Sequence, residues 1–290
     1  MQASLAHRAA SGARVGTAAR ELAQGEGWSV KDVLCTSGPG DRPFEELHKR
    51  VAIAVVVAGS FGYRCPSGRG LMTPGSWLLG NAGERFECGH EHAAGDRCVA
   101  FHYAPDWFER LAADAGAPRG ARRFRAPRVP PLREASALVA RAAAGLAGAG
   151  LARWEELALE VAGAALRLAG DAPADRGAVP AAVAARITER VRAIERRPDA
   201  PWTLARLAGD AGQSPFHFLR MFRRVTGVTP HQFILRARLR EAAARLRGGE
   251  AKIIEVALDA GFGDVSNFNR AFRAEFGVPP RTYGGWRRAG

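Results

Sequence analysis

A short segment of the chain carries side chains that can hold a metal ion or act as nucleophiles. Cys88, His90 and His92 stand at alternate positions, so they project to one face if their segment is a strand. Cys98 follows after a short turn, and His102 lies further along the next expected strand. Thiolates and neutral imidazoles are ligands that zinc and copper favour. The segment is therefore a candidate metal site or thiol-reactive sensor.

The same residues also have a purely structural explanation. Cys88 and Cys98 can be small core residues, while His90 and His92 hydrogen-bond to nearby groups. Spacing on a single hairpin does not choose between a core, a metal or thiol sensor, and a catalytic centre. The candidate metal ligands are Cys88, His90, His92 and Cys98, and no cofactor is assigned.

A second set of functional candidates lies in the last third of the chain, which repeats itself. Four residues recur 49 positions later, and they are Ala208, Asp210, Ala211 and Gly212. Seven more recur 50 positions later, and they are Phe218, Arg220, Phe222, Arg223, Gly227, Val228 and Pro230. Identities in this order, with a single change of offset, indicate two copies of one structural unit.

Each copy has the pattern of a helix, a tight turn and a second helix, at about residues 203–225 and 252–275. In the first copy, Gly212 stands where a helix end favours a positive φ. Ser214 and Pro215 then supply a capping side chain and a first-turn proline. This pattern predicts a helix-turn-helix, whose second helix can enter the major groove of DNA.

Charge and exposed side chains favour nucleic acid as the partner. Residues 181–290 hold 20 basic and 10 acidic residues and account for most of the net charge of +13. A basic region of this kind indicates that the chain binds a polyanion. The exposed faces of both second helices carry arginine and asparagine, which suit base edges and phosphates. A long helix expected at 230–246 could space the two units along one face of a duplex.

Five motifs in this region form a more specific string than a generic helix-turn-helix. They are SPFHFLRMFR at 214–223, GVTP at 227–230, VALDAGF at 256–262, FNRAFR at 268–273 and FGVPPRTY at 276–283. With them, residues 183–287 resemble the AraC/XylS-type bacterial transcriptional regulators. The resemblance implies two helix-turn-helix units joined by one helix, which bind successive major-groove segments of a promoter and usually activate transcription.

The resemblance also implies which residues face DNA. They are Phe216, Leu219, Arg220 and Arg223 in the first unit, and Val265, Ser266, Asn267, Arg270 and Arg273 in the second. Arg270 is expected on a base edge, with a phosphate or salt bridge as the alternative, while Arg223 and Arg273 favour phosphates or structural pairs. Val265 stands where the family commonly has a polar residue, so it touches a thymine methyl or reads no base. The apolar Leu219 leaves open whether the first unit reads bases or clamps the backbone.

Short strands dominate the chain before its middle. Candidate strands, separated by glycine- and proline-containing turns, lie at 51–57, 77–79, 85–92 and 97–103. This spacing predicts an antiparallel β-sandwich or small β-barrel. Residues 75–101 also resemble the cupin-like sensory half found in one group of the same family. That resemblance implies a small-molecule pocket in the barrel and a homodimer through the helices expected within 132–168.

The predicted fold class is therefore α+β and multidomain. A cupin-like antiparallel β-barrel or sandwich with helices precedes an all-α tandem helix-turn-helix domain. The expected segments are a disordered tail at 1–26, a sensory and dimerisation domain at 27–170, a linker at 171–179 and a DNA-binding domain at 180–290. Within the sensory domain, helices are expected at 106–115 and, as two pieces broken near 145–150, at 132–168.

Composition excludes several classes of protein. The longest apolar run, 142–152, is far shorter than the roughly 18 residues of a membrane span. The N-terminus has no apolar segment ahead of a cleavage site, and four cysteines in 290 residues make no disulfide framework. Cys35 and Cys65 give no functional signal. The chain is expected to be soluble, cytoplasmic and reduced, with no membrane partner.

The leading hypothesis is an effector-responsive transcription regulator without catalysis of its own, whose partners are promoter DNA, RNA polymerase and a second copy of the chain. A small molecule or metal in the N-terminal domain would change how the two units sit on DNA. The alternative is a cupin-type metal-dependent oxygenase that uses His90 and His92. It needs a further carboxylate and a histidine on a later strand, and beyond His102 no later strand brings one. A purely architectural DNA-binding protein would need neither the sandwich nor the Cys/His hairpin.

Overall fold

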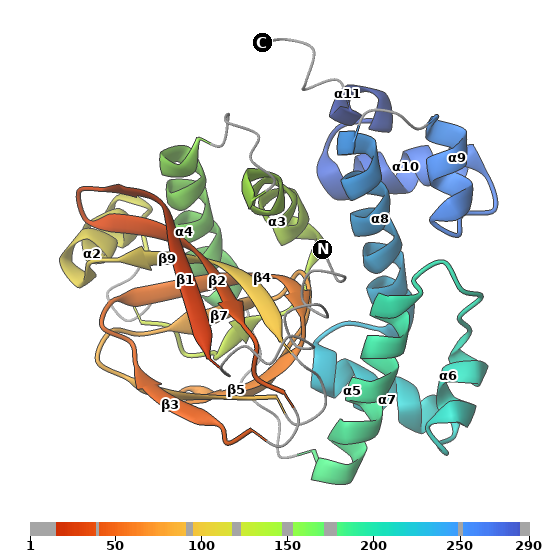
Figure 1. Cartoon of the computed structure of the whole chain (residues 1–290), viewed down its shortest axis with the longest axis horizontal. Helices are drawn as coiled ribbons and strands as arrows, with labels where there is room; N and C mark the ends of the chain where they lie inside the picture. The colour runs from red at the N-terminus through yellow and green to blue at the C-terminus, as the bar shows by residue number, and fades with distance from the viewer. Residues whose placement is uncertain are drawn as a thin grey trace. The chain divides into compact units, whose positions relative to one another are not determined.

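The chain divides into two compact units, Met1–Ala178 and Val179–Gly290. The computed structural model describes residues 16–38, 41–90, 95–117, 123–146, 153–170, 179–248 and 252–284 (Figure 1). Residues 171–178 of the expected linker lie outside these ranges, so the linker stays a prediction.

The described strands of the N-terminal unit form two antiparallel sheets. The larger sheet contains, in spatial order, β1 (Thr17–Gly25), β2 (Trp28–Cys35), β9 (Asp96–Tyr103), β4 (Val51–Gly59), β7 (Trp77–Gly80) and β10 (Arg128–Val129). The smaller sheet contains β3 (Phe44–Leu47), β8 (Arg85–Gly89), β5 (Phe61–Cys65) and β6 (Gly68–Met72). The strands described here form two open sheets and no closed barrel, so the sandwich of the two predicted alternatives is confirmed. The cupin-like assignment stays a prediction.

Alternation along β9 gives the larger sheet two different faces. Val99, Phe101 and Tyr103 belong to a core shared with the helices α2 (Pro105–Asp114), α3 (Arg133–Leu146) and α4 (Trp154–Gly170) (Figure 1). Cys98, on the opposite face, joins a second apolar cluster that includes residues of β5, β6 and β8. The unit is therefore layered as helices, larger sheet and smaller sheet, and successive β9 side chains enter different layers.

Two expectations for this unit need correction. The tail expected to be disordered at 1–26 contains β1, which pairs with β2 from Thr17↔Cys35 to Gly25↔Trp28. Most β1 side chains are exposed, so its order comes from backbone pairing at a sheet edge, which hydrophobic periodicity does not reveal. The strand expected at 85–92 ends at Gly89, and residues 91–94, which include His92, lie outside the described residues.

The helices of this unit agree with the expected pattern. The expected helix at 106–115 is α2, and the break near 145–150 separates α3 from α4. Both α3 and α4 contribute buried side chains to the core on the larger sheet. A homodimer contact through them stays a prediction. None of the helices within the described ranges is long and apolar enough to cross a bilayer.

The C-terminal unit is helical throughout its described residues. Its helices are α5 (Ala181–Arg196), α6 (Leu204–Asp210), α7 (Pro215–Thr226), α8 (Pro230–Gly248), α9 (Ile253–Asp259), α10 (Val265–Phe276) and α11 (Pro280–Gly284). The pairs α6–α7 and α9–α10 are the two predicted helix-turn-helix units, and α8 is the long helix between them (Figure 1).

Candidate nucleic-acid interface

The second helix of each unit begins with the same capping geometry. At the start of α7, the Ser214 hydroxyl accepts a hydrogen bond from the backbone N–H of His217 at 3.3 Å. At the start of α10, the Asp264 carboxylate accepts from the N–H of Asn267 at 2.7 Å. Each cap satisfies one of the N–H groups that a helix leaves unpaired in its first turn. The first turn of each helix is therefore held by a side chain that the repeat supplies.

The ends and the buried faces of the two helices also correspond. Both helices end at a glycine with a left-handed backbone, Gly227 at φ 85° and Gly277 at φ 78°. Their buried residues are Phe218, Met221, Phe222 and Thr226 in α7, and Phe268, Phe272, Glu275 and Phe276 in α10. With one face fixed by burial, the opposite face of each helix is fixed toward solvent.

That opposite face carries one exposed stripe on each helix. The stripes consist of Phe216, Arg220 and Arg223 on α7 and of Ser266, Arg270 and Arg273 on α10. The members of the two stripes are equivalent, because the repeat has an offset of 50 positions here. The structure thus presents the same face of both helices, with an arginine in two successive turns of each.

An exposed aromatic ring distinguishes the stripe of α7. Phe216 is 74% exposed, and the Arg220 guanidinium carbon lies 6.0 Å from the centroid of its ring. This distance is at the outer limit of a cation–π contact. A single exposed apolar side chain does not by itself indicate a partner, so Phe216 is a functional candidate through its place on the stripe.

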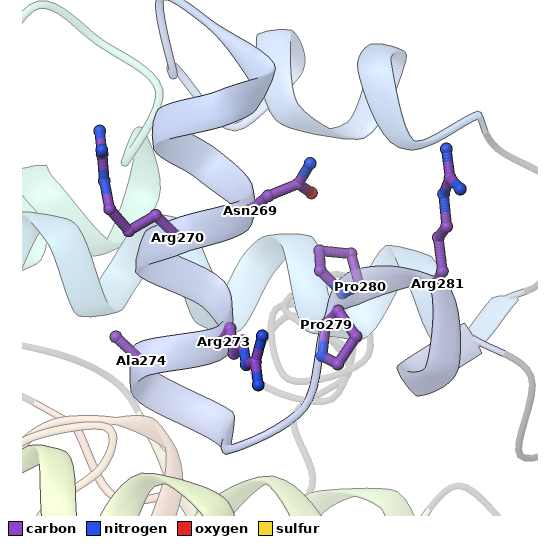
Figure 2. A pocket seen from close by; sticks show the side chains of 7 residues that line it. All are labelled: Asn269, Arg270, Arg273, Ala274, Pro279, Pro280 and Arg281. Carbon is purple, nitrogen blue, oxygen red and sulfur yellow. The ribbon is translucent and has the colours of Figure 1, made fainter.

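An open groove of about 670 Å³ lies beside the stripe of α10 (Figure 2). Its lining residues are Asn269, Arg270, Arg273, Ala274, Pro279, Pro280 and Arg281. Three of these are arginines, and no ion pair holds any of the three within the described part of the chain. A groove with unneutralised guanidinium groups and an amide is chemically suited to phosphate oxygens and base edges.

Several arginines of α8 are occupied elsewhere, in ties to the surrounding helices. Arg238 is the most connected of them, because its guanidinium donates to three main-chain oxygens. These are Pro198 at 2.8 Å, Ala200 at 2.9 Å and Gly261 at 2.8 Å. Burial lowers the pKa of Arg238, against a smaller opposing effect of Asp199. One side chain therefore joins α8 to the loop before α6 and to the turn of the second unit.

Four further α8 arginines make similar ties. The pairs are Arg236–Glu275 at 3.2 Å, Arg240–Glu195 at 2.6 Å, Arg245–Asp259 at 2.7 Å and Arg247–Tyr283 at 3.0 Å. They join α8 to α10, α5, α9 and α11. The net positive charge of this unit thus has two parts, one engaged in packing the helices and one exposed on the stripes.

The structure separates the residues expected to face DNA by exposure. Asn267 is exposed beside the α10 stripe, whereas Leu219 and Val265 are half-buried. Asn269 and Arg281 belong to the groove and were not among the expected site residues. Asn269 is the repeat counterpart of Leu219, so the offset of 50 positions could have found it. No signal in the sequence placed Arg281 beside α10.

The Cys/His segment of the N-terminal unit is arranged differently from the expected hairpin. His90 Nε2 lies 2.7 Å from Asp96 Oδ1, and the Cys98 thiol donates to Asp96 Oδ2 at 3.3 Å. Cys35, for which the sequence gave no functional signal, offers a ligand atom within 4.8 Å of those of His90 and Asp96. Cys88 packs in the apolar cluster between the sheets. The structure thus brings together Cys35, His90, Asp96 and Cys98, and His92 lies outside the described residues.

Electrostatics give this group an unusual protonation pattern. Burial acts to raise the pKa of Cys35, but hydrogen bonds with His90 and Ser37 outweigh it and lower the pKa. Burial acts to lower the pKa of His90, but hydrogen bonds with Asp96 and Cys35 raise it to about 9. Burial raises the pKa of Cys98. In the metal-free chain these shifts favour a protonated His90 ring beside Asp96 and a protonated Cys98 thiol, and a metal ion bound by these residues would displace both protons.

His48 and Tyr63 form a separate polar group, and burial, with a contribution from the charge of His102, lowers the pKa of His48. Tyr63 donates its hydroxyl hydrogen to the main-chain oxygen of Leu79 at 3.0 Å, so His48 Nε2, at 3.0 Å, donates to the Tyr63 oxygen. The group of potential metal ligands found among the described residues contains Cys35, His90 and Asp96 but not His102. Of the histidines expected for a cupin-type oxygenase, His90 and His102 are therefore not brought into one ligand group among the described residues, and nothing else supports that alternative.

Known proteins resemble the C-terminal unit. A family model described as a helix-turn-helix domain matches residues 207–285. The regulatory protein SoxS of Salmonella typhimurium is 37% identical over 90 residues, which cover 31% of this chain and 84% of SoxS. The HTH-type transcriptional regulator MtrA of Neisseria gonorrhoeae is 28% identical over 98 residues, 34% of this chain. That match spans only 33% of MtrA.

Solved structures match the same region and, more distantly, most of the chain. The DNA-binding domain of AdpA, solved with a target DNA, covers 36% of this chain and 94% of its own at 28% identity, with a TM-score of 0.35. ToxT of Vibrio cholerae, solved with an unsaturated fatty acid, covers 91% of this chain and 96% of its own at 15% identity, with a TM-score of 0.36. At TM-scores this low, neither likeness bears on how this chain works.

Proposed function

This chain belongs to the AraC/XylS-type family of bacterial transcriptional regulators, and we propose that it regulates transcription by binding promoter DNA with both helix-turn-helix units. The observation that carries this proposal is the repetition of one exposed, arginine-bearing stripe on α7 and on α10. A helical bundle that needed these helices only for packing would have no reason to present the same cationic face twice.

The connecting helix supports a joint action of the two units. Helix α8 has 19 residues and therefore spans about 28 Å. Successive major-groove segments on one face of B-DNA are about 34 Å apart. Because Arg238 ties α8 both to the segment before α6 and to the turn between α9 and α10, the two helix-turn-helix units can act as one body on a duplex. We expect them to occupy neighbouring major-groove segments.

The roles of individual residues follow from exposure and chemistry. We assign base contacts to Arg220 and Arg270, because each stands in the middle of its stripe and can form a bidentate pair with guanine. Arg223 and Arg273, one turn further along, are assigned to phosphates. The remaining contacts are assigned to Phe216, Leu219, Val265, Ser266, Asn267 and, from the groove, Asn269 and Arg281. The half-buried Leu219 and Val265 would make apolar contacts only.

The N-terminal unit is proposed to receive the signal. We infer that an effector, a small molecule or a metal, binds this unit and shifts the chain between states of different DNA affinity. Homodimerisation through α3 and α4, contact with RNA polymerase, activation as the usual outcome and the absence of catalysis are further parts of this proposal. They rest on the family and not on a contact in the described residues.

Selection of genomic fragments tests the proposal directly. The full chain is incubated with fragmented genomic DNA from its source, the retained fragments are sequenced, and binding to one of them is measured by fluorescence anisotropy. We expect enrichment of promoter fragments over coding fragments and an affinity that falls steeply with salt, because several phosphates are neutralised. Equal retention of all fragments, or an affinity that does not change with salt, contradicts the proposal.

A further inference from the structure

We propose that Cys35, His90 and Asp96 form a closed binding site for a zinc ion at one end of the β-sandwich, with Cys98 as the fourth ligand. We refer to these four residues as the Cys35 cluster. The proposal concerns the N-terminal unit alone, so it can fail or hold independently of the DNA-binding function proposed above.

Strand pairing brings the ligands together from distant parts of the sequence. Cys35 ends β2 and Asp96 begins β9, and the two residues are direct partners in the larger sheet. Cys98 lies two positions along β9 and therefore on the same face as Asp96. His90 follows the last residue of β8, which belongs to the smaller sheet. An ion held by these side chains would join the two sheets of the sandwich.

The distances fit a zinc tetrahedron after small movements. The ligand atoms of Cys35, His90 and Asp96 all lie within 4.8 Å of one another. Ligands bound to zinc at 2.0–2.3 Å in a tetrahedron are roughly 3.3–3.8 Å apart. The separation of 3.3 Å between Cys98 Sγ and Asp96 Oδ2 is already in that range, and the 2.7 Å between His90 and Asp96 must open by less than about 1 Å. Cys98 does not belong to the group whose ligand atoms all lie within 4.8 Å of one another, so its Sγ must also move toward Cys35 or His90 to become the fourth ligand. Rotation of side chains can supply shifts of this size.

The donor set selects the metal. Two cysteine sulfurs, an imidazole nitrogen and a carboxylate oxygen form a set that zinc accepts in four-coordinate sites. Calcium and magnesium favour sites made of oxygen atoms. Copper(I) selects sulfur-rich sites without a carboxylate. The mixture of soft and hard ligands therefore points to zinc.

Burial decides between a metal site and a reactive thiol. The exposed fractions of Cys35, His90, Asp96 and Cys98 are 3%, 5%, 4% and 4%. A cysteine that senses oxidants or electrophiles must be reached by them, whereas structural zinc sites are closed. Neighbouring groups also orient the ligands, since the ring of Phe61 stacks on that of His90 with centroids 5.7 Å apart. An apolar wall of this kind fixes the orientation of the imidazole and keeps water from the site, as the hydrophobic shell of a metal site does.

Cobalt binding to the full chain tests this site. The chain is purified under reducing conditions, freed of metal with a chelator and titrated with Co²⁺, whose bound form has visible spectra that report ligand type. We expect saturation at one ion per chain, a thiolate-to-cobalt charge-transfer band and tetrahedral d–d bands, and we expect both kinds of band to disappear when Zn²⁺ displaces the cobalt. Absence of a saturating signal, or bands without the thiolate component, overturns the proposal.

Variants identify the ligands. Cys35→Ser and Asp96→Asn should each weaken Zn²⁺ binding by at least about 100-fold, since even loss of a supporting group costs about 10–100-fold. Cys65→Ser is the matched control, because Cys65 is a free cysteine of the same unit that contacts Ser67 at 3.0 Å. This variant should bind as the unaltered chain does. A folded Cys35→Ser with unchanged spectrum and affinity overturns the proposal.

A measurement on the unaltered chain covers the case in which both ligand variants fail to fold. X-ray absorption at the zinc edge should then show sulfur together with nitrogen or oxygen in the first coordination shell, for the unaltered chain and for Cys65→Ser. A first shell of nitrogen and oxygen alone overturns the proposal.

Discussion

Arg238 donates through Nη1 to the main-chain oxygen of Gly261 at 2.8 Å, and this bond joins the connecting helix to the turn of the second helix-turn-helix unit. Gly261 has a φ of 82°. A Cβ there would lie 2.8 Å from the Asp199 oxygen and 3.1 Å from the guanidinium carbon of Arg238. The turn of the second unit is therefore packed against the segment that leads into the first. This contact joins the two helix-turn-helix units within the C-terminal unit.

Replacing Arg238 with alanine should destabilise the whole C-terminal unit. The substitution removes three hydrogen bonds from one guanidinium and leaves three main-chain oxygens without that partner. We expect a loss of about 2–4 kcal/mol in the free energy of unfolding of this unit. Native-state hydrogen exchange of α8–α10 peptides in the full chain measures it. Arg223→Ala, at an exposed arginine, is the control, and equal protection in both variants would contradict the structural role of Arg238.

Alanine at Gly261 should cost more than alanine at Gly212, although the two glycines are equivalent in the repeat. Both have positive φ, 82° and 62°, so each substitution carries about 1–2 kcal/mol of backbone strain. Only at Gly261 would the new Cβ meet other atoms within 4 Å. We therefore expect Gly261→Ala to lower the free energy of unfolding by at least about 1 kcal/mol more than Gly212→Ala does. Hydrogen exchange of the two turns compares them, and equal losses would argue against the packing described here.

The repeat made the C-terminal unit predictable, and its helix ends most of all. Ser214 and Gly227 define the ends of α7 by local chemistry, and their equivalents do the same in α10. The pairing of distant strands was not predictable. Nothing in the sequence of either strand shows that Cys35 pairs with Asp96. The sequence also did not show which arginines are engaged in packing and which are exposed. Arg238 and Arg270 look alike in a charge count, and only packing shows that the first is engaged and the second exposed.

Substitution of Arg270 should weaken and broaden DNA recognition. Arg270→Ala removes an exposed guanidinium from the centre of the α10 stripe, and loss of a bidentate base contact costs about 1–3 kcal/mol of discrimination. We expect promoter affinity to fall and preference to relax at one base pair, as measured with a set of single-base variants of a bound fragment. Arg245→Ala, which removes an arginine paired with Asp259, is the matched control and should keep the preference. An unchanged preference in Arg270→Ala would exclude a base contact.

Acid should destabilise the N-terminal unit between about pH 6.5 and pH 4. Burial lowers the pKa of His48 and of His102 from 6.5 to about 4, so both stay neutral in the folded chain while they are protonated in the unfolded chain. The unfolded state therefore binds more protons, and stability falls as the pH drops through this window. Each histidine contributes up to about 3 kcal/mol of this loss.

Urea unfolding at pH 7 and pH 5, followed in the strands of the larger sheet by hydrogen exchange, measures this effect. His48→Gln should reduce the change in the free energy of unfolding between pH 7 and pH 5 by the contribution of one histidine. His231→Gln, at an exposed histidine of the other unit, should leave it unchanged. A pH dependence that is the same in His48→Gln as in the unaltered chain would show that His48 does not titrate in this window.

Footprinting of the full chain on a selected promoter fragment tests the double contact with DNA most directly. Cleavage protection should cover two major-groove segments on one face of the duplex, about one helical turn apart. Arg220→Ala should weaken protection of one segment and Arg270→Ala that of the other, because these arginines hold equivalent positions on α7 and α10. Protection of a single segment, with the same response to both substitutions, would contradict the proposal that both units bind DNA.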